Sequence, residues 1–117
     1  MKLASTLLCA CTLCGLPLPA IANLANCIIE KMPGATNAAI HSAVLRSCFQ
    51  KYPDGFLGIE RGSGRGFFSF KDQDACIIKT AKETPFPPGA SAIANACSCL
   101  YKKPEFEGEM CAYPRAP

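Results

Sequence analysis

Apolar residues recur every three or four positions in four stretches of the chain, which is the spacing that lines one face of a helix. The most regular stripes are Ile40, Val44, Cys48 and Tyr52, and then Ile93, Cys97 and Tyr101. The pattern predicts helices over about 23–31, 37–51, 72–83 and 90–103. The expected fold class is therefore mainly α.

Polar residues and helix breakers mark the ends of these helices. Side-chain oxygens of Asn23, of Thr36 or Asn37, and of Asp72 or Asp74 are suited to cap a first helical turn. Segments that contain proline and glycine, typical of turns and loops, lie at 32–34, 53–55 and 85–89. We therefore expect two helical hairpins, the second with a loop over 85–89.

One spacing occurs twice in the chain. The tripeptide Cys-Ile-Ile begins at Cys27 and again at Cys76, and a further cysteine follows 21 positions later each time, at Cys48 and at Cys97. An ungapped alignment of the two segments has seven identities in 26 columns. This agreement predicts an internal repeat of two disulfide-pinned helical hairpins. The two units span about 23–53 and 72–103.

A segment rich in glycine and phenylalanine, residues 54–71, separates the two units. It is too aromatic for a plain flexible linker, so we expect its phenylalanines to pack against the hairpins. A short β-hairpin is the expected structure, with residues 56–60 paired to residues 66–70 through a turn at 61–65. The tail, residues 104–117, is expected to be an exposed extension.

The first 22 residues have the pattern of a secretory signal peptide. A lysine at position 2 precedes an apolar run that ends near Leu16, and Ala20 and Ala22 place small residues at a cleavage site. The run is shorter than the about 20 residues of a membrane span. We predict cleavage after Ala22, which leaves residues 23–117 as one small domain, secreted or periplasmic. A lipid-modified chain that begins at Cys11 is the alternative.

The cysteines agree with export. Three of the nine lie in the predicted signal peptide, and the six that remain are Cys27, Cys48, Cys76, Cys97, Cys99 and Cys111. An even number in a short exported chain indicates a disulfide framework. The repeat predicts the pairs Cys27–Cys48, Cys76–Cys97 and Cys99–Cys111, although Cys97 and Cys99 are close enough in sequence to exchange partners.

Charge argues against one class of partner. The chain has 12 basic and 9 acidic residues, and its net charge of +3 falls to +2 without the lysine of the signal peptide. Its basic residues are spread along the sequence, whereas nucleic-acid-binding proteins concentrate them on one face. We therefore expect no nucleic-acid partner. The mature chain also has no second apolar run that would span a membrane.

The centre of the insertion is a candidate binding site. Its residues are Arg61, Gly62, Ser63, Gly64 and Arg65. Successive N–H groups in such turns form anion-binding nests, and arginine adds paired donors. The lysine and the spacing of a P-loop are absent. The segment is therefore a candidate for binding a small anion or a partner, and the simpler interpretation is a hairpin turn with solvated arginines.

Catalytic chemistry has little support in these residues. His41 is the single histidine, and a catalytic role would pair it with a carboxylate such as Glu30 or Asp54. No serine lies in a Gly-x-Ser-x-Gly motif, and oxidised cysteines do not bind metal ions. We predict no catalytic residue, no metal site and no bound cofactor.

These observations favour an exported, non-catalytic protein that works by binding a protein or a small anion. The insertion supports this hypothesis because a connector between two hairpins needs only a few residues. A second hypothesis is a small secreted enzyme that uses His41 with a carboxylate. A third is a structural protein of the cell envelope without a discrete ligand.

Overall fold

A computed structural model describes residues 22–66 and 70–111. Within these ranges the chain is mainly helical, with four α-helices and no β-strand. The elements are α2 (Leu24–Lys31), α3 (Ala38–Lys51), the short 3₁₀ helix η2 (Gly55–Gly58), α4 (Gln73–Ala81) and α5 (Pro87–Tyr101). The predicted fold class is confirmed at this level. None of the described helices has the length and apolar character that a membrane crossing requires. Almost all of the predicted signal peptide lies outside the described residues.

Three of the four α-helices begin at polar residues that the sequence indicates. The side-chain oxygen of Asn23 accepts a hydrogen bond from the amide three residues later, over 2.9 Å. Asn37 caps α3 in the same way, and Asp72 caps α4. These bonds satisfy amides that the first turn of a helix leaves without a partner. The caps are thus Asn37 instead of Thr36, and Asp72 instead of Asp74.

The fourth helix begins earlier than the sequence predicts. A loop was expected over 85–89, but α5 already starts at Pro87. Proline at the first positions of a helix loses no hydrogen bond, because those amides have no partner inside the helix, and its fixed φ suits the turn. The two prolines therefore begin α5.

Three disulfides join the helices and the tail. They are Cys27–Cys48, Cys76–Cys97 and Cys99–Cys111. In the first two the cysteines are 21 positions apart, and their Cα atoms are 5.8 and 5.7 Å apart. These are the predicted pairings, and they assign Cys97 to the helix pair and Cys99 to the tail. Each bond restricts the conformations of the unfolded chain and so stabilises the folded state by about 3 kcal/mol.

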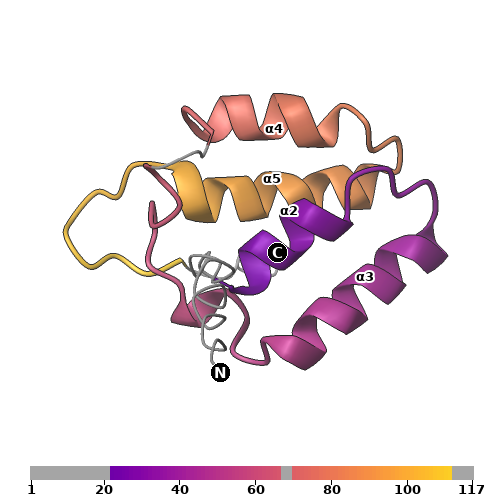
Figure 1. The fold of residues 1–117 in the computed structure, drawn as a ribbon, viewed down its shortest axis with the longest axis horizontal. Helices are drawn as coiled ribbons and strands as arrows, with labels where there is room; N and C mark the ends of the chain where they lie inside the picture. Colours follow the sequence, from indigo (N-terminus) through magenta and orange to yellow (C-terminus); the bar gives the residue numbers. More distant parts are fainter. Residues whose placement is uncertain (1–21, 67–69, 112–117) are drawn as a thin grey trace, which may run out of the picture.

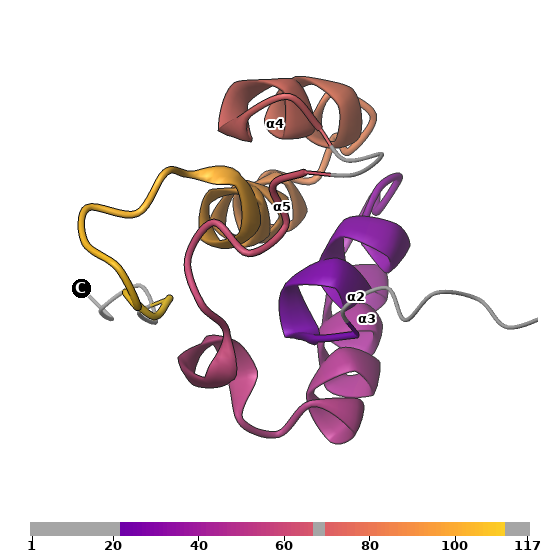
Figure 2. The ribbon, with the colours of Figure 1, turned by 60° about the vertical axis from the view of Figure 1, so that its left-hand side comes forward.

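The central helix of the fold is α5. Figure 1 shows α4 along one side of α5, α2 against another side, and α3 beside α2 at the periphery. Figure 2 shows the same order from a second direction. Large, fully buried side chains come mainly from α2 and α5 and include Leu24, Met32, Ile93 and Leu100. In α3 only Cys48 is buried, so this helix depends strongly on its disulfide.

The loops inside the two helix pairs contact each other, at the end of the molecule away from the tail (Figure 1). The amide of Gly34 donates to Oγ1 of Thr84 over 3.1 Å, and the amide of Phe86 donates to the carbonyl of Ala35 over 3.3 Å. Gly89 packs against the same contact, since a Cβ there would lie 3.1 Å from Cγ2 of Thr84. These loops therefore help to join the two helix pairs.

The prediction of a β-hairpin within the insertion is wrong for the residues that the structure describes. Residues 55–58 form η2, and Glu60 pairs with Met110 of the tail in a single antiparallel bridge. The amide of Cys111 donates to the carbonyl of Ile59 over 2.7 Å. The disulfide with Cys99 holds Cys111 next to Ile59. The segment therefore pairs with the tail, and not with a neighbouring strand of its own.

Candidate functional site

The glycine-rich loop, residues 61–66, lies against the last turn of α5. The amide of Gly62 donates to the carbonyl of Cys99 over 2.8 Å, and the amide of Gly64 donates to the carbonyl of Leu100 over 2.9 Å. The last carbonyls of a helix have no partner inside the helix. The glycine-rich loop therefore caps the C-terminal end of α5.

The other amides of the predicted anion nest are also engaged. The amide of Ser63 donates to the carbonyl of Glu60, and the amide of Arg65 donates to the carbonyl of Gly62, both over 3.1 Å. Four successive amides thus donate to carbonyls of the chain itself. Anion binding at residues 61–65 stays a prediction, and the donors that this geometry leaves for it are the exposed side chain of Arg65 and the buried hydroxyl of Ser63, which has no hydrogen-bond partner among the described residues.

Two glycines permit this close approach. Gly62 has a φ of +80°, and a Cβ there would lie 2.9 Å from Cδ of Pro104. A Cβ on Gly64 would lie 2.8 Å from the Cβ of Leu100 and 3.2 Å from its carbonyl oxygen. Any larger residue at position 62 or 64 would push the loop away from α5.

Arg61 and Glu109 form an ion pair between the glycine-rich loop and the tail. Nε of Arg61 contacts Oε2 of Glu109, and each side chain is only 16% exposed. Nη1 of Arg61 also donates to the carbonyl and the hydroxyl of Ser98, over 3.3 and 3.4 Å. The positive charge lies at the C-terminal end of α5, where the helix dipole favours it. Arg65 is exposed, so the two arginines do different things.

The tail loop, residues 102–110, is closed by the disulfide at its base and is braced by Glu109. The carboxylate of Glu109 accepts the amide of Glu105 over 2.9 Å. The amide of Glu109 donates to the carbonyl of Phe106 over 3.2 Å, and its carbonyl accepts the amide of Arg61 over 2.8 Å. One residue therefore holds the turn of the tail loop and fastens it to the glycine-rich loop.

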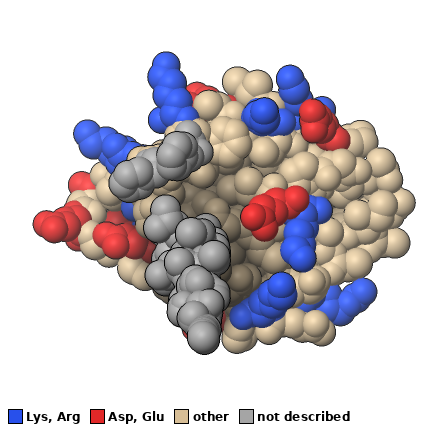
Figure 3. Space-filling view, viewed as in Figure 1, with Lys and Arg blue, Asp and Glu red and all other residues tan. Residues whose placement is uncertain are grey.

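This end of the molecule exposes large apolar side chains. Phe106 is 65% exposed, Met110 is 46% exposed, and Leu57 of η2 is 64% exposed. Exposed carboxylates lie beside them along the chain, at Glu60, Glu105 and Glu107. Figure 3 shows acidic side chains gathered at the end of the molecule where Figure 1 places the tail loop. Lys102 and Lys103 of the same loop are exposed as well, so apolar groups are displayed together with charges of both signs.

The phenylalanines of the insertion have a structural role where they are described. Phe56 is buried, and the ring of the half-buried Phe70 is edge-on to Tyr101, with ring centroids 5.5 Å apart. Burial raises the pKa of Tyr101, and a hydrogen bond with the Phe70 backbone partly offsets this increase. Both phenylalanines pack as the sequence predicts. Phe67 and Phe68 lie outside the described residues.

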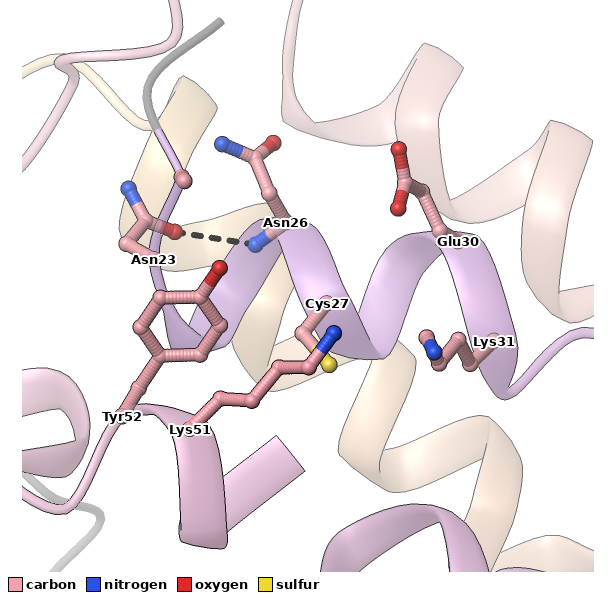
Figure 4. A pocket seen from close by; sticks show the side chains of 8 residues that line it. Asn23, Asn26, Cys27, Glu30, Lys31, Lys51 and Tyr52 are labelled. Atoms are coloured by element: carbon pink, nitrogen blue, oxygen red, sulfur yellow. Dashed lines mark hydrogen bonds between the residues drawn. The ribbon is translucent and has the colours of Figure 1, made fainter. Parts of the chain in front are cut away.

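A shallow hollow lies between α2 and the end of α3. In Figure 4, Lys51 and Tyr52 face α2 from below, near Asn23 and Cys27. Its volume of about 170 Å³ is smaller than the roughly 300–1,000 Å³ of typical small-molecule sites. Ala22 forms part of its wall, so cleavage after Ala22 would open it further. The hollow is smaller than a typical small-molecule site.

Among the described residues, His41 has an aromatic neighbour and no hydrogen bond or ion pair with a carboxylate. The ring of His41 stands edge-on to Phe86, with centroids 5.6 Å apart. Glu30, in the last turn of α2, is one of the residues that line the hollow, whereas Asp54 follows the C-terminal end of α3. That end is about 15 Å along the helix axis from His41. Within the described ranges, no three histidine, cysteine or acidic side chains are grouped as a metal site.

No protein-family model matches the chain, and neither a curated protein nor a solved structure is significantly similar to it. The function is therefore argued from the chain's own geometry.

Proposed function

We propose that this protein is exported and that it works by binding another protein through the tail loop, without catalysis. The observation that carries the proposal is the side chain of Phe106, which is 65% exposed on a braced loop. The loop is held by a disulfide, an ion pair and backbone hydrogen bonds. Aromatic side chains are frequent anchors of protein interfaces, and a loop that is already ordered loses little entropy on binding.

Export is supported by the disulfides and by the start of the sequence. Three disulfides in a domain of this size are typical of oxidising compartments. The first 22 residues have the charge, apolar run and small residues of a signal peptide. The protein therefore acts in the periplasm or outside the cell.

The rest of the molecule is a scaffold of two copies of one helical hairpin. Two intervals support this duplication: α4 begins 49 positions after α2, and α5 begins 49 positions after α3. The disulfide within each pair spans 21 positions. Each copy is followed by a segment without a counterpart in the other, namely the insertion and the tail. The binding surface belongs to these added segments.

Site-specific photo-crosslinking tests the proposal. The photoreactive residue p-benzoylphenylalanine is placed at position 106, and the protein is irradiated in its native host. A discrete adduct with another protein is expected. The matched control carries the same residue in place of Ile78, which is 64% exposed on α4, and it should not form this adduct.

Excess wild-type protein should suppress the adduct at position 106, because both forms compete for one partner. The proposal is wrong if position 106 gives no adduct. It is also wrong if positions 106 and 78 give the same set of adducts, since the contact would then be unspecific.

A further inference from the structure

We infer that the thioether of Met110 is a modification site, and that its oxidation to the sulfoxide by hydrogen peroxide turns off binding by the tail loop. This inference rests on the proposed function, because it describes how binding at that surface is regulated. The thioether of methionine is apolar, whereas the sulfoxide is polar. One added oxygen atom therefore changes the character of the surface that displays Phe106.

Met110 carries the sulfur atom that an oxidant can reach in the described part of the chain. The six cysteines of residues 22–66 and 70–111 are all paired in disulfides, so no thiol competes for the oxidant. The same ranges contain two methionines, Met32 and Met110. Met32 is 0% exposed in the core, whereas Met110 is 46% exposed. Because oxidation follows exposure, we expect it at Met110 and not at Met32.

The backbone places Met110 on the same surface as Phe106. Met110 forms a single antiparallel pair with Glu60, and two backbone hydrogen bonds, of 2.8 and 2.7 Å, join the residues on either side of this pair. In such a non-hydrogen-bonded pair the Cα atoms are about 4.5 Å apart and the two side chains are close neighbours. Met110 also follows directly after the turn that begins at Phe106, where the amide of Glu109 donates to the Phe106 carbonyl over 3.2 Å.

Apolar contact is what this surface offers a partner, because its exposed charges are in balance. The exposed acidic residues are Glu60, Glu105 and Glu107, and the exposed basic residues are Lys102, Lys103 and Arg65. Net charge therefore favours neither an acidic nor a basic partner. The energy of binding must come mainly from apolar side chains that become buried, and Met110 is one of them.

The oxidation step needs hydrogen peroxide and no catalytic group of the protein. The sulfur of Met110 attacks one oxygen of the peroxide, the O–O bond breaks, and a sulfur–oxygen bond forms. The sulfur is oxidised by two electrons, and the other oxygen leaves with both hydrogen atoms as water. Methionine sulfoxide reductases reverse the change, with a dithiol as the reductant that becomes a disulfide while the oxygen leaves as water.

The sulfoxide weakens binding for two reasons. A polar group that is buried without a hydrogen bond opposes association, so the sulfoxide resists transfer into an apolar interface. Its oxygen also carries partial negative charge, which adds to that of the neighbouring Glu60 carboxylate. The oxidised surface therefore no longer suits the partner that buries Phe106.

Peptide mapping tests the site without any partner. The oxidised mature protein is treated with hydrogen peroxide in the presence of N-acetylmethionine amide, which reports the rate of a fully exposed thioether. Met110 should gain one oxygen at a rate within about threefold of this reference, and Met32 should react at least about tenfold more slowly. Equal rates for the two methionines, or no reaction at Met110, overturn the inference while the proposed function stands.

The photo-adduct at position 106 tests the effect on binding. The purified mature protein that carries the photoreactive residue is treated with hydrogen peroxide, freed of it, and irradiated with an extract of its host. The adduct yield should fall at least about fivefold. Met110→Leu is the matched control, because leucine is apolar and similar in volume to methionine but has no thioether. Its adduct yield should be the same before and after treatment.

The remaining outcomes separate the inference from the proposed function. A wild type that is oxidised at Met110 and keeps its full adduct yield overturns the inference, and the proposed function stands. An equal loss of adduct in the wild type and in Met110→Leu has the same meaning, because the affected group is then not Met110. The absence of any adduct before oxidation overturns both.

Discussion

Gly64 lies so close to the last turn of α5 that no side chain fits between them. Its amide caps the carbonyl of Leu100, and the Cβ of Leu100 occupies the space that a side chain would need. Glycine at this position is thus required by the contact between two backbones. Together with Gly62 it turns a segment that resembles an anion site in sequence into the cap of a helix.

Gly64→Ala should therefore destabilise the fold by about 1–3 kcal/mol, the usual cost of an overpacked contact. Gly58→Ala is the matched control, because the nearest atom to its added Cβ, the Cβ of Asp54, is 3.8 Å away. It should change the stability by less than about 0.5 kcal/mol. Thermal unfolding of both variants measures the difference. Equal melting temperatures would mean that the glycine-rich loop is not packed on α5.

The two arginines of the glycine-rich loop should also differ. Arg61→Met removes the counterion of the Glu109 carboxylate and one of the two donors to the carbonyl of Ser98, which costs about 1–3 kcal/mol for groups this far from solvent. Arg65→Met removes only an exposed charge and should cost less than about 0.5 kcal/mol. Denaturant unfolding compares the two. The sequence alone predicts two solvated arginines with equally small effects, and that result would contradict the ion pair.

At the scale of elements, the helices could be predicted from the sequence, because capping residues and the spacing of apolar residues are local signals. Asn23, Asn37 and Asp72 cap helices where the polar residues predict it. The sequence predicts the start of α5 too late, because proline and glycine over 85–89 indicate a loop, whereas Pro87 and Pro88 form the first turn of the helix. The two disulfides with the same sequence separation could be predicted because that interval occurs twice in the sequence.

The contact between the glycine-rich loop and the tail loop could not be predicted from the sequence, for a physical reason. The glycines of residues 61–66 suit the turn of a local hairpin, yet Glu60 pairs with Met110 of the tail, fifty positions later, where the disulfide of Cys111 holds it. The sequence presents Arg61 either as a candidate for binding an anion or a partner or as a solvated side chain, but Glu109 provides its counterion. The available signal was the short interval from Cys99 to Cys111, which closes a loop with Phe106 between two glutamates.

Removal of the disulfide between Cys99 and Cys111 tests whether this bond orders the tail loop. Cys99→Ala with Cys111→Ala should lower stability by up to about 3 kcal/mol and should free the tail loop, while the other two disulfides keep the helices together. Far-ultraviolet circular dichroism should therefore change little. A protease specific for glutamate should cut the tail loop much faster than in the wild type. Unchanged cleavage would mean that the disulfide does not order the loop.

At the scale of the whole molecule, processing and cross-linking can be measured together. Intact mass of the protein exported by its native host should correspond to residues 23–117, and reduction should add two hydrogen atoms for each of three disulfides. This result follows from the small residues before Asn23. A chain that begins at Cys11 and carries lipid would contradict the predicted cleavage and would attach the protein to a membrane.

The central claim is that the glycine-rich loop holds the tail loop against α5. Amide hydrogen exchange of the oxidised mature protein, followed by NMR, tests this claim most directly. The amides of Arg61, Gly62, Gly64 and Cys111 donate across the three segments, so they should exchange orders of magnitude more slowly than in an unstructured peptide. The amides of Arg61 and Cys111 should lose this protection when Cys99 and Cys111 are replaced. Exchange of all four at the rate of an unstructured peptide, with the amides of α5 still protected, would show that the tail loop is not held and would contradict a preformed binding surface.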